Sequence, residues 1–417
     1  MALRNWLGGL AKQPAVKSSA AGPLIAWSQI GRAKWTPRRY DALAEEGFRK
    51  NVVAYRCISM VAGAAAQIPW LLYDGEGREL TSHPLLQILE QPNPLMDGVS
   101  FRENLFAAYQ IAGNVYIEAV RPDSGAPREL YPLRSDRMRV VPGPTGFPQG
   151  YEYQAGGQTM RWNADPLTGA SNILHVRHYH PLDDWYGLAP LEAALLAIDQ
   201  HNAAGGWNQA LLNNGARPSG ALVFAPKEGP AHLSEEQVRR LKDQLDEYYQ
   251  GARNAGKPML LEGGLDWRPM SLSPQDMDWL KGRDAAARDI ALAFGVPSQL
   301  VGLPDAQTYA NIKEARLAFY EETVLPLAMR FVASFNHWIA PMFGDGLVLD
   351  LDLDEVSALA QRREAVWEKL QRVDFLTINE KRDAAGYGPL ADGDRLVFSA
   401  APLSAPSSSS ITERGSP

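Results

Sequence analysis

Apolar residues recur at helical spacing along much of the 417-residue chain. In the first such stretch one face carries Val52, Tyr55 and Ile58, which predicts a helix that ends before Pro69. Ser100, followed three residues later by Glu103, forms the pattern of a capping box at the start of another helix. The helical pattern as a whole covers residues 41–68, 84–91, 100–113, 190–213, 234–251, 276–294, 309–343 and 357–373.

Between residues 115 and 179 the period of the apolar positions changes to two. Short runs rich in β-branched and aromatic residues are bounded there by Gly, Pro, Asn or Asp, which predicts a meander of strands. The runs are "VYIEAVR", "ELYPLR", "MRVVPG", "YEYQAGG", "QTMRWN" and "NILHVRHY". An earlier stretch, "WLLYDGEGREL", predicts a hairpin. Helices followed by a meander indicate an α+β fold rather than alternating βαβ units.

The second half of the chain predicts two helices that flank a small α+β insertion, residues 217–274. The first of these helices contains the pair Gly205-Gly206, which should weaken or kink it. An antiparallel pair of helices carries whatever joins it to one end, so a stalk and a tip are expected. A polar loop over residues 297–308 follows, flanked by Gly and Pro, and Pro326 predicts a kink in the long helix after it.

Composition and charge narrow the classes of protein. The apolar fraction of 45% and the charged fraction of 21% are typical of a globular protein. The net charge of −7 argues against tight binding of nucleic acid through clustered cations. The single cysteine, Cys57, lies among apolar residues and fits a reducing compartment. Neither a membrane-spanning stretch nor a secretory signal is evident, so a soluble cytoplasmic protein is expected.

Two clusters resemble chemical sites. The run "HVRHYH" brings together His175, His178 and His180, but on a strand only the last two would share a face. The run "DLDLDE" places three aspartates on one face of a strand without the glycine and glutamate that a calcium loop requires, so a charged strand edge is favoured.

No phosphate-binding loop, dinucleotide fingerprint or nucleophile elbow is present in the sequence. We therefore expect no catalytic residues, no cofactor and no metal site. A metal-dependent hydrolase that uses His175, His178 and His180 remains the alternative enzyme hypothesis, which metal analysis would test.

Several longer motifs follow one another along the chain: "NVVAYRCISMVAGAAAQIPWLLY", "HPLLQILEQPNPLMDGVSFRENL", "YGLAPLEAALLAI", "LLNNGARPSGAL" and "GLDWRPMSLSPQDMDWLKGRDAAARDIALAFGVPSQLVG". This series resembles the portal proteins of tailed bacteriophages, specifically the HK97-type family. The resemblance covers about residues 40 to 395, in order. The stretch "AGPLIAWSQIGRAKWTPR" is also similar to portals of phage-like gene transfer agents. A shorter head–tail adaptor is the other connector class, and the length of the chain argues against it.

The resemblance implies a subunit with an α/β wing, a helical stem, a small α+β clip, a long kinked helix and a helical crown. Mapped onto this chain, these parts are an N-terminal arm (1–40), wing (41–189), first stem helix (190–216), clip (217–274), second stem helix (275–296), tunnel loop (297–308), long helix (309–345), crown (346–400) and a disordered tail (401–417). The Ser- and Pro-rich composition of the tail independently favours disorder.

The resemblance also implies the partners. The chain should form a homo-oligomeric ring of twelve subunits in a virion, contact the major capsid protein, the terminase large subunit and a head–tail adaptor, and let double-stranded DNA pass with weak, non-specific contact, after assembly in the host cytoplasm. No membrane partner is expected.

Two groups of residues follow from this mapping. The tunnel loop would present Ser298, Gln299, Asp305, Gln307 and Thr308. Residues 297–309 contain no Lys or Arg, which suits a loop that touches a moving duplex without holding it. The partner surface of the clip would present Glu235, Glu236, Arg239 and Arg240.

Overall fold

The computed structural model describes residues 35–37, 39–122, 125–144, 146–213, 220–224, 233–249, 265–269, 279–303 and 309–396. The elements below belong to one compact unit that begins at Thr36. It contains both helices and antiparallel sheets, so the predicted α+β class is confirmed.

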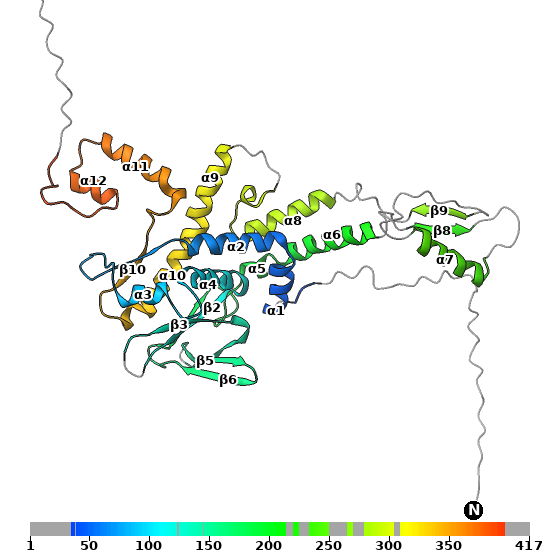
Figure 1. Ribbon diagram of the computed structural model, residues 1–417, viewed down its shortest axis with the longest axis horizontal. Coiled ribbons are helices and arrows are strands. Elements are labelled where there is room, and N and C mark those ends of the chain that lie inside the picture. The colour runs from blue at the N-terminus through cyan, green and yellow to red at the C-terminus, as the bar shows by residue number, and fades with distance from the viewer. Residues whose placement is uncertain are drawn as a thin grey trace, which may run out of the picture. The chain divides into compact units, whose positions relative to one another are not determined.

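Helices precede and follow a central group of strands (Figure 1). They are α1 (Tyr40–Leu43), α2 (Val52–Ala66), α3 (Pro84–Glu90), α4 (Gly98–Ala112), α5 (Pro190–Ala193), α6 (Leu195–Asn213), α7 (Glu235–Tyr249), α8 (Trp279–Ala293), α9 (Tyr309–Phe319), α10 (Leu325–Trp338), α11 (Ala360–Arg372) and α12 (Ile378–Ala384).

The strands form small antiparallel sheets. They are β1 (Trp70–Tyr73), β2 (Asn114–Val120), β3 (Glu129–Leu133), β4 (Met138–Pro142), β5 (Pro148–Ala155), β6 (Gln158–Asn163), β7 (Ile173–Arg177), β8 (Gly220–Phe224), β9 (Leu265–Pro269) and β10 (Val348–Leu351). The orders are β3-β2-β7, β4-β5-β6, β1-β10 and β8-β9. The six runs predicted from alternation are therefore strands β2 to β7.

The core is built around α2, which lies beside α4 and also contacts α8 and α10 (Figure 1). Its buried positions include Ala54, Cys57, Ile58, Ala62 and Ala65, each with 0% exposure. Small side chains let neighbouring helices approach α2 closely, and larger residues on α4 and α10 fill the space between them. Among these are Phe106 and Phe331, whose rings meet edge to face with centroids 4.8 Å apart.

The long helix predicted over 309–343 is interrupted just before Pro326. A π-helical turn, Tyr320–Val324, joins α9 to α10, and Pro326 lies in the first turn of α10. Proline cannot donate a backbone hydrogen bond and clashes with the carbonyl one turn earlier. The wider π turn accommodates both the missing donor and the clash, so a helix continues after the proline as α10.

Three local predictions were wrong. The side chain of Asp97, not Ser100, caps α4, because its Oδ1 atom accepts a hydrogen bond from the backbone N–H of Ser100 at 2.8 Å. The predicted hairpin forms only a single bridge, and β1 instead pairs with β10, which buries Leu349 and Leu351. The helix after Pro190 breaks at Ala194, whereas the glycine pair lies within α6.

The aspartate run also differs from the prediction. Strand β10 ends at Leu351, so Asp352 and Asp354 lie beyond it rather than on one strand face with Asp350. The carboxylate of Asp352 accepts a hydrogen bond from the backbone N–H of Asp354 at 2.9 Å, which turns the chain.

Candidate functional site

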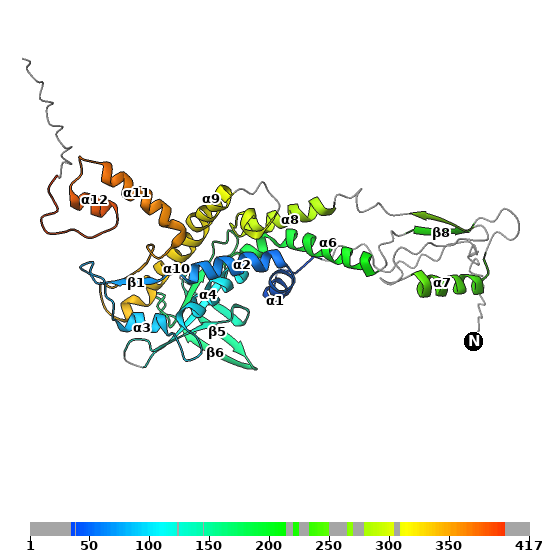
Figure 2. The same ribbon diagram turned by 45° about the horizontal axis from the view of Figure 1, so that its top comes forward.

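Helices α6 and α8 run side by side and join the rest of the unit at the start of α2 (Figure 2). The side chain of Asn51 caps α2 by accepting hydrogen bonds from Val53 and Ala54 through Oδ1. Its Nδ2 atom lies 3.3 Å from Nδ1 of His201 on α6 and donates to Asn202 at 3.0 Å. One amide therefore links the core helix to the helix pair.

The imidazole of His201 bridges α6 to α8. Its Nε2 atom accepts a hydrogen bond from Nε of Arg283 at 3.3 Å, so in the neutral ring the proton is on Nδ1, which lies beside the Asn51 amide. Burial and then the nearby Arg283 lower the pKa of His201, while Asp284 acts in the opposite direction. The neutral ring is the form that this junction favours.

A second contact fastens the beginning of the described unit to α6. The backbone N–H and the hydroxyl of Thr36 both donate to the carboxylate of Asp199. The side chain of Asn202 donates to the carbonyl of Glu46 at 2.9 Å. The helix pair is thus held at its base by polar contacts from three separate segments.

The predicted loop over 297–308 begins as a packed turn. Residues Ser298–Val301 form a 3₁₀ turn that ends at Gly302, whose φ of 79° is in the left-handed region. Leu300 and Val301 pack against the core, so the expectation that the whole loop is a polar connector is wrong for its first half. The apolar letters of "SQLVGL" are the signal that could have revealed this.

The base of this turn is tied to the π turn of the long helix. The Thr323 hydroxyl donates to the carbonyl of Gly295 at 2.6 Å, and a Cβ at Gly295 would lie 2.5 Å from that hydroxyl oxygen. Ser298 and Gln299 are half-buried within the turn. The other predicted loop residues, Asp305, Gln307 and Thr308, lie outside the described residues.

Helix α7 begins at the predicted cap. Ser234 Oγ accepts from the backbone N–H of Gln237 at 3.2 Å, and the Gln237 side chain accepts in return from the backbone N–H of Ser234 at 2.8 Å. All four predicted residues of the partner surface are exposed: Glu235, Glu236, Arg239 and Arg240. Glu236 and Arg240 form an i,i+4 ion pair of 2.6 Å.

The three histidines do not converge on a common point. His175 stacks on Tyr116 in the sheet, and its Nε2 atom lies 3.0 Å from Oδ1 of Asn114. His178 follows β7 and stacks on Tyr109 of α4, so the expected strand face shared with His180 is not formed. His180 accepts a hydrogen bond from the backbone N–H of Leu182. The cluster therefore serves packing and turn formation.

Within the described ranges, no group of three or more His, Cys, Asp or Glu side chains is arranged to hold a metal ion. Over the same part of the chain, no helix has the length and apolar character to span a membrane.

Residues 52–386 match the family model described as phage portal protein. The chain belongs to the phage portal protein family. Portal proteins are structural components rather than enzymes, which agrees with the expectation that the chain has no catalytic activity. The family match covers the core, the helix pair and the long helix of this portal protein.

Known relatives agree with this membership. A relative from Rickettsia felis, with no function in its name, is 42% identical over 373 residues, which is 89% of this chain and 94% of the relative. The portal protein of Enterobacteria phage HK97 is 24% identical over 407 residues, which is 94% of this chain and 90% of the phage protein. A chain from the neck of an empty gene transfer agent particle is 45% identical with a TM-score of 0.67, covering 86% of this portal protein and 96% of that chain.

Sequence reasoning missed the residues that fasten the helix pair of this portal protein. Asn51, His201 and Arg283 come from three segments that are far apart in the sequence. Asn51 could have been found as a helix cap, because it directly precedes a strongly apolar-periodic stretch. Its contact with α6 has no local signal.

The stacked histidines make stability depend on pH. Burial, and then Arg177, lower the pKa of His175 from 6.5 to about 3, and burial, then Arg330, lower that of His178 to about 4. The unfolded chain therefore binds these protons below pH 6.5, while the folded chain does not until the pH is much lower. Stability should be complete above pH 6.5 and fall toward pH 4.5, by about 1.4 kcal/mol per pH unit for each fully titrating ring.

Chemical denaturation between pH 7 and 4.5 measures this slope. His175→Gln keeps a donor for Asn114 but cannot be protonated, so it should lower the slope by the equivalent of one proton. An unchanged slope in that variant would show that His175 already titrates in the folded protein.

Proposed function

We propose that this portal protein forms a ring of twelve subunits at one vertex of a particle of the gene-transfer-agent type. Terminase would package double-stranded DNA through the ring, and the tail would receive that DNA later. The observation that carries the proposal is the likeness to gene transfer agent neck chains, 45% identical with a TM-score of 0.67. A related chain at 44% identity comes from the neck of a native particle computed with C12 symmetry.

The helix pair suits the stem of such a subunit. Helices α5 and α6 (within 190–216) would form its first half, and α8 (within 275–296) its second. Strands β8 and β9 with α7 would form the clip, over 217–274. Residues 41–189 would be the wing, 309–345 the long helix and 346–400 the crown, with 1–40 as an arm and 401–417 as a tail.

The tunnel loop would then follow Leu303. Its first half is fixed to the core through Leu300 and Val301, so the segment with Asp305, Gln307 and Thr308 starts from a rigid base. A segment without cations can contact a duplex weakly, because phosphate affinity comes from Lys and Arg. Weak contact is what transport through a channel requires.

The proposed partners follow from the position in the particle. The wing would face the major capsid protein, while the clip would face the terminase large subunit during packaging and the head–tail adaptor afterwards. Assembly would take place in the host cytoplasm before the ring becomes part of the virion.

Electron microscopy of the purified full-length protein tests the ring directly. Annular particles with a central hole and twelve-fold class averages are expected. A monodisperse monomer under conditions that support particle assembly would contradict the proposal.

Two added cations per subunit should slow DNA in the tunnel loop. In the variant Gln307→Lys/Thr308→Lys a twelve-fold ring gains about 24 cations near one duplex, and each phosphate neutralised adds to binding. Packaging should stall at low salt and recover in part as salt rises, because salt screens the new contacts. Packaging assays at several salt concentrations measure the effect.

The control Gln307→Asn/Thr308→Ser changes the same positions without adding charge and should package normally. Both variants should form rings, since the packed part of the turn ends before them. Normal packaging at low salt by rings of the lysine variant would remove these positions from the channel.

The exposed face of α7 should tune partner binding. Arg239→Glu/Arg240→Glu reverses two charges and also breaks the ion pair of Arg240 with Glu236. Terminase or adaptor binding should weaken mainly through a slower association rate, while rings still form. Surface plasmon resonance on assembled rings measures that rate.

The matched control Glu236→Arg/Arg240→Glu exchanges the two charges and keeps both the ion pair and the net charge of the helix. It should bind partners within about threefold of the wild type, as expected for a local rearrangement at a rim. Equal binding by both variants and the wild type would exclude this face of α7 as the docking surface.

A further inference from the structure

Helices α11 and α12 enclose an open groove with a volume of about 660 Å³. Each helix turns one face toward it, with positions spaced i, i+3 and i+4: Trp367, Leu370 and Gln371 from α11, and Ile378, Lys381 and Arg382 from α12. Asp374, which follows α11, and Ala385, which follows α12, also line it. Tyr387 completes the lining. We call this feature the α11–α12 groove.

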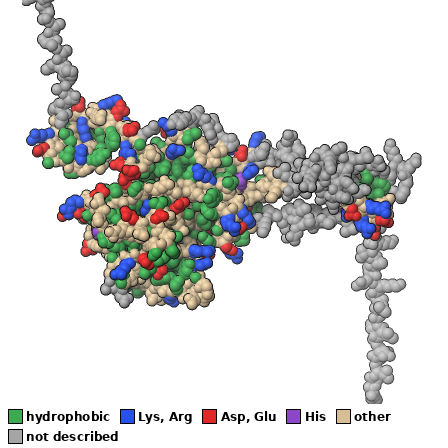
Figure 3. Space-filling view, viewed as in Figure 1, with side chains coloured by type: hydrophobic (Ala, Val, Ile, Leu, Met, Phe, Trp, Pro, Cys, Tyr) green, Lys and Arg blue, Asp and Glu red, His purple; other side chains and the backbone are tan. Residues whose placement is uncertain are grey.

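The apolar side chains of the groove are held in place but left uncovered. The rings of Trp367 and Tyr387 have centroids 6.5 Å apart, and the Arg382 guanidinium lies 5.6 Å from the centroid of Tyr387. Trp367 is 39% exposed, Ile378 38% and Tyr387 42%. Hydrophobic side chains are visible on the surface of these helices in Figure 3.

The segment that contains both helices has almost no core of its own. Between Ala360 and Leu396, Gly393 is the one residue that is buried among those whose burial is described. Leu390 and Leu396 are 52% and 48% exposed as well. Two short helices cannot offset their ordering entropy without burying apolar surface, so an apolar cover is expected.

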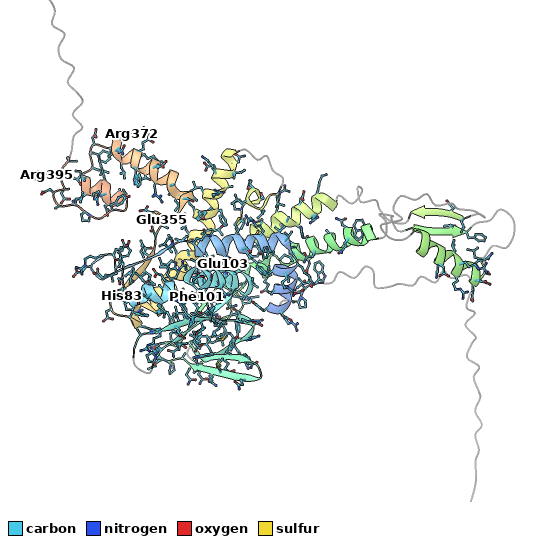
Figure 4. The ribbon with its side chains drawn as sticks, viewed as in Figure 1. His83, Phe101, Glu103, Glu355, Arg372 and Arg395 are labelled. Carbon is cyan, nitrogen blue, oxygen red and sulfur yellow. The ribbon has the colours of Figure 1, made fainter. Side chains whose placement is uncertain are left out.

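The chain leaves this segment next to the groove. Asn379, the neighbour of Ile378, donates to the Asp394 carboxylate at 2.8 Å, and its backbone N–H donates to the carbonyl of Gly393 at 2.9 Å. A Cβ at Gly393 would lie 2.1 Å from Oδ1 of Asn379, so only glycine permits this approach. Arg395 accordingly lies beside α12 in Figure 4.

The residues that follow are suited to an apolar site. Val397-Phe398-Ser399-Ala400-Ala401-Pro402-Leu403 directly continues the chain and carries three large apolar side chains. Residues 396–412 contain no charged residue, so burial of this stretch has no charge-desolvation cost. Four residues from Asp394 to Phe398 can span up to about 13 Å, enough to reach across a neighbouring helix.

We infer that Val397–Leu403 of the same subunit lies in the α11–α12 groove as a strap, with Phe398 inserted between the aromatic walls. The strap supplies the core that the two helices lack, and the Ser- and Pro-rich residues after it take no part. This inference concerns a single subunit and does not depend on the proposed ring.

Cysteine cross-linking in the full-length protein tests the strap. Gln371→Cys/Ser399→Cys pairs the strap with a residue that lines the groove. Lys369→Cys/Ser399→Cys uses another exposed residue of the same helix, one that does not line the groove. The native Cys57 is fully buried, and burial raises the pKa of its thiol to about 12, so it should not react.

A short bis-maleimide should join the Gln371→Cys/Ser399→Cys pair within one chain at a yield about tenfold above that of the Lys369→Cys/Ser399→Cys pair. Burial of one large apolar side chain favours the bound strap by about this factor. Adding Phe398→Asp to the first pair should reduce its yield to the level of the second, whereas adding Ser407→Asp should not. Mass spectrometry identifies the joined residues.

Equal yields for the two pairs, or a yield that Phe398→Asp leaves unchanged, would overturn the strap. Cross-links that join two subunits would also overturn it, because the groove would then hold a neighbouring copy. A milder variant, Phe398→Ala, should raise hydrogen exchange in α11 and α12 about tenfold if folding of the aspartate variant is in question.

Discussion

The close packing around α2 is the constraint on which the rest of the subunit depends. This helix contacts α4, which supports the β3-β2-β7 sheet, and also α8, α10 and the turns before and within the long helix. Its buried face is made largely of alanine, so the distances between its neighbours are set by backbone approach rather than by adaptable side chains. Helices α4, α8 and α10 therefore share one rigid reference.

Polar contacts at the start of α2 extend this rigidity to the pair of helices α6 and α8. The side chain of Asn51 accepts from two backbone N–H groups of α2 and also donates to Asn202 on α6. Loss of this one side chain would therefore remove both the helix cap and the link to α6. Between His201 and Arg283 the contact is longer and depends on a neutral ring. The 3₁₀ turn Ser298–Val301 rests on the same core through Leu300 and Val301.

Local sequence patterns predicted most elements because their cause is local. The alternation of β2 to β7 and the periodicity of α2, α4, α7 and α8 follow from which side of each element is buried. The pairing of β1 with β10 could not be predicted, since nearly 280 residues separate the strands and a nearby Gly-rich turn offers a competing hairpin. The packed turn Ser298–Val301 could not be predicted from the pattern, because Gly302 and Pro304 are typical of an exposed loop and only two apolar residues, Leu300 and Val301, indicate burial.

A portal subunit that must handle a polyanion benefits from a fold whose stability does not depend on salt. In each ion pair between described residues, at least one partner has a side chain that is 47% exposed or more, and such pairs contribute little. Apolar packing around α2 and neutral hydrogen bonds at Asn51 hold the fold instead, and salt screens neither of them strongly. Ionic strength can then alter how the ring meets DNA and its partners while leaving the shape of each subunit unchanged.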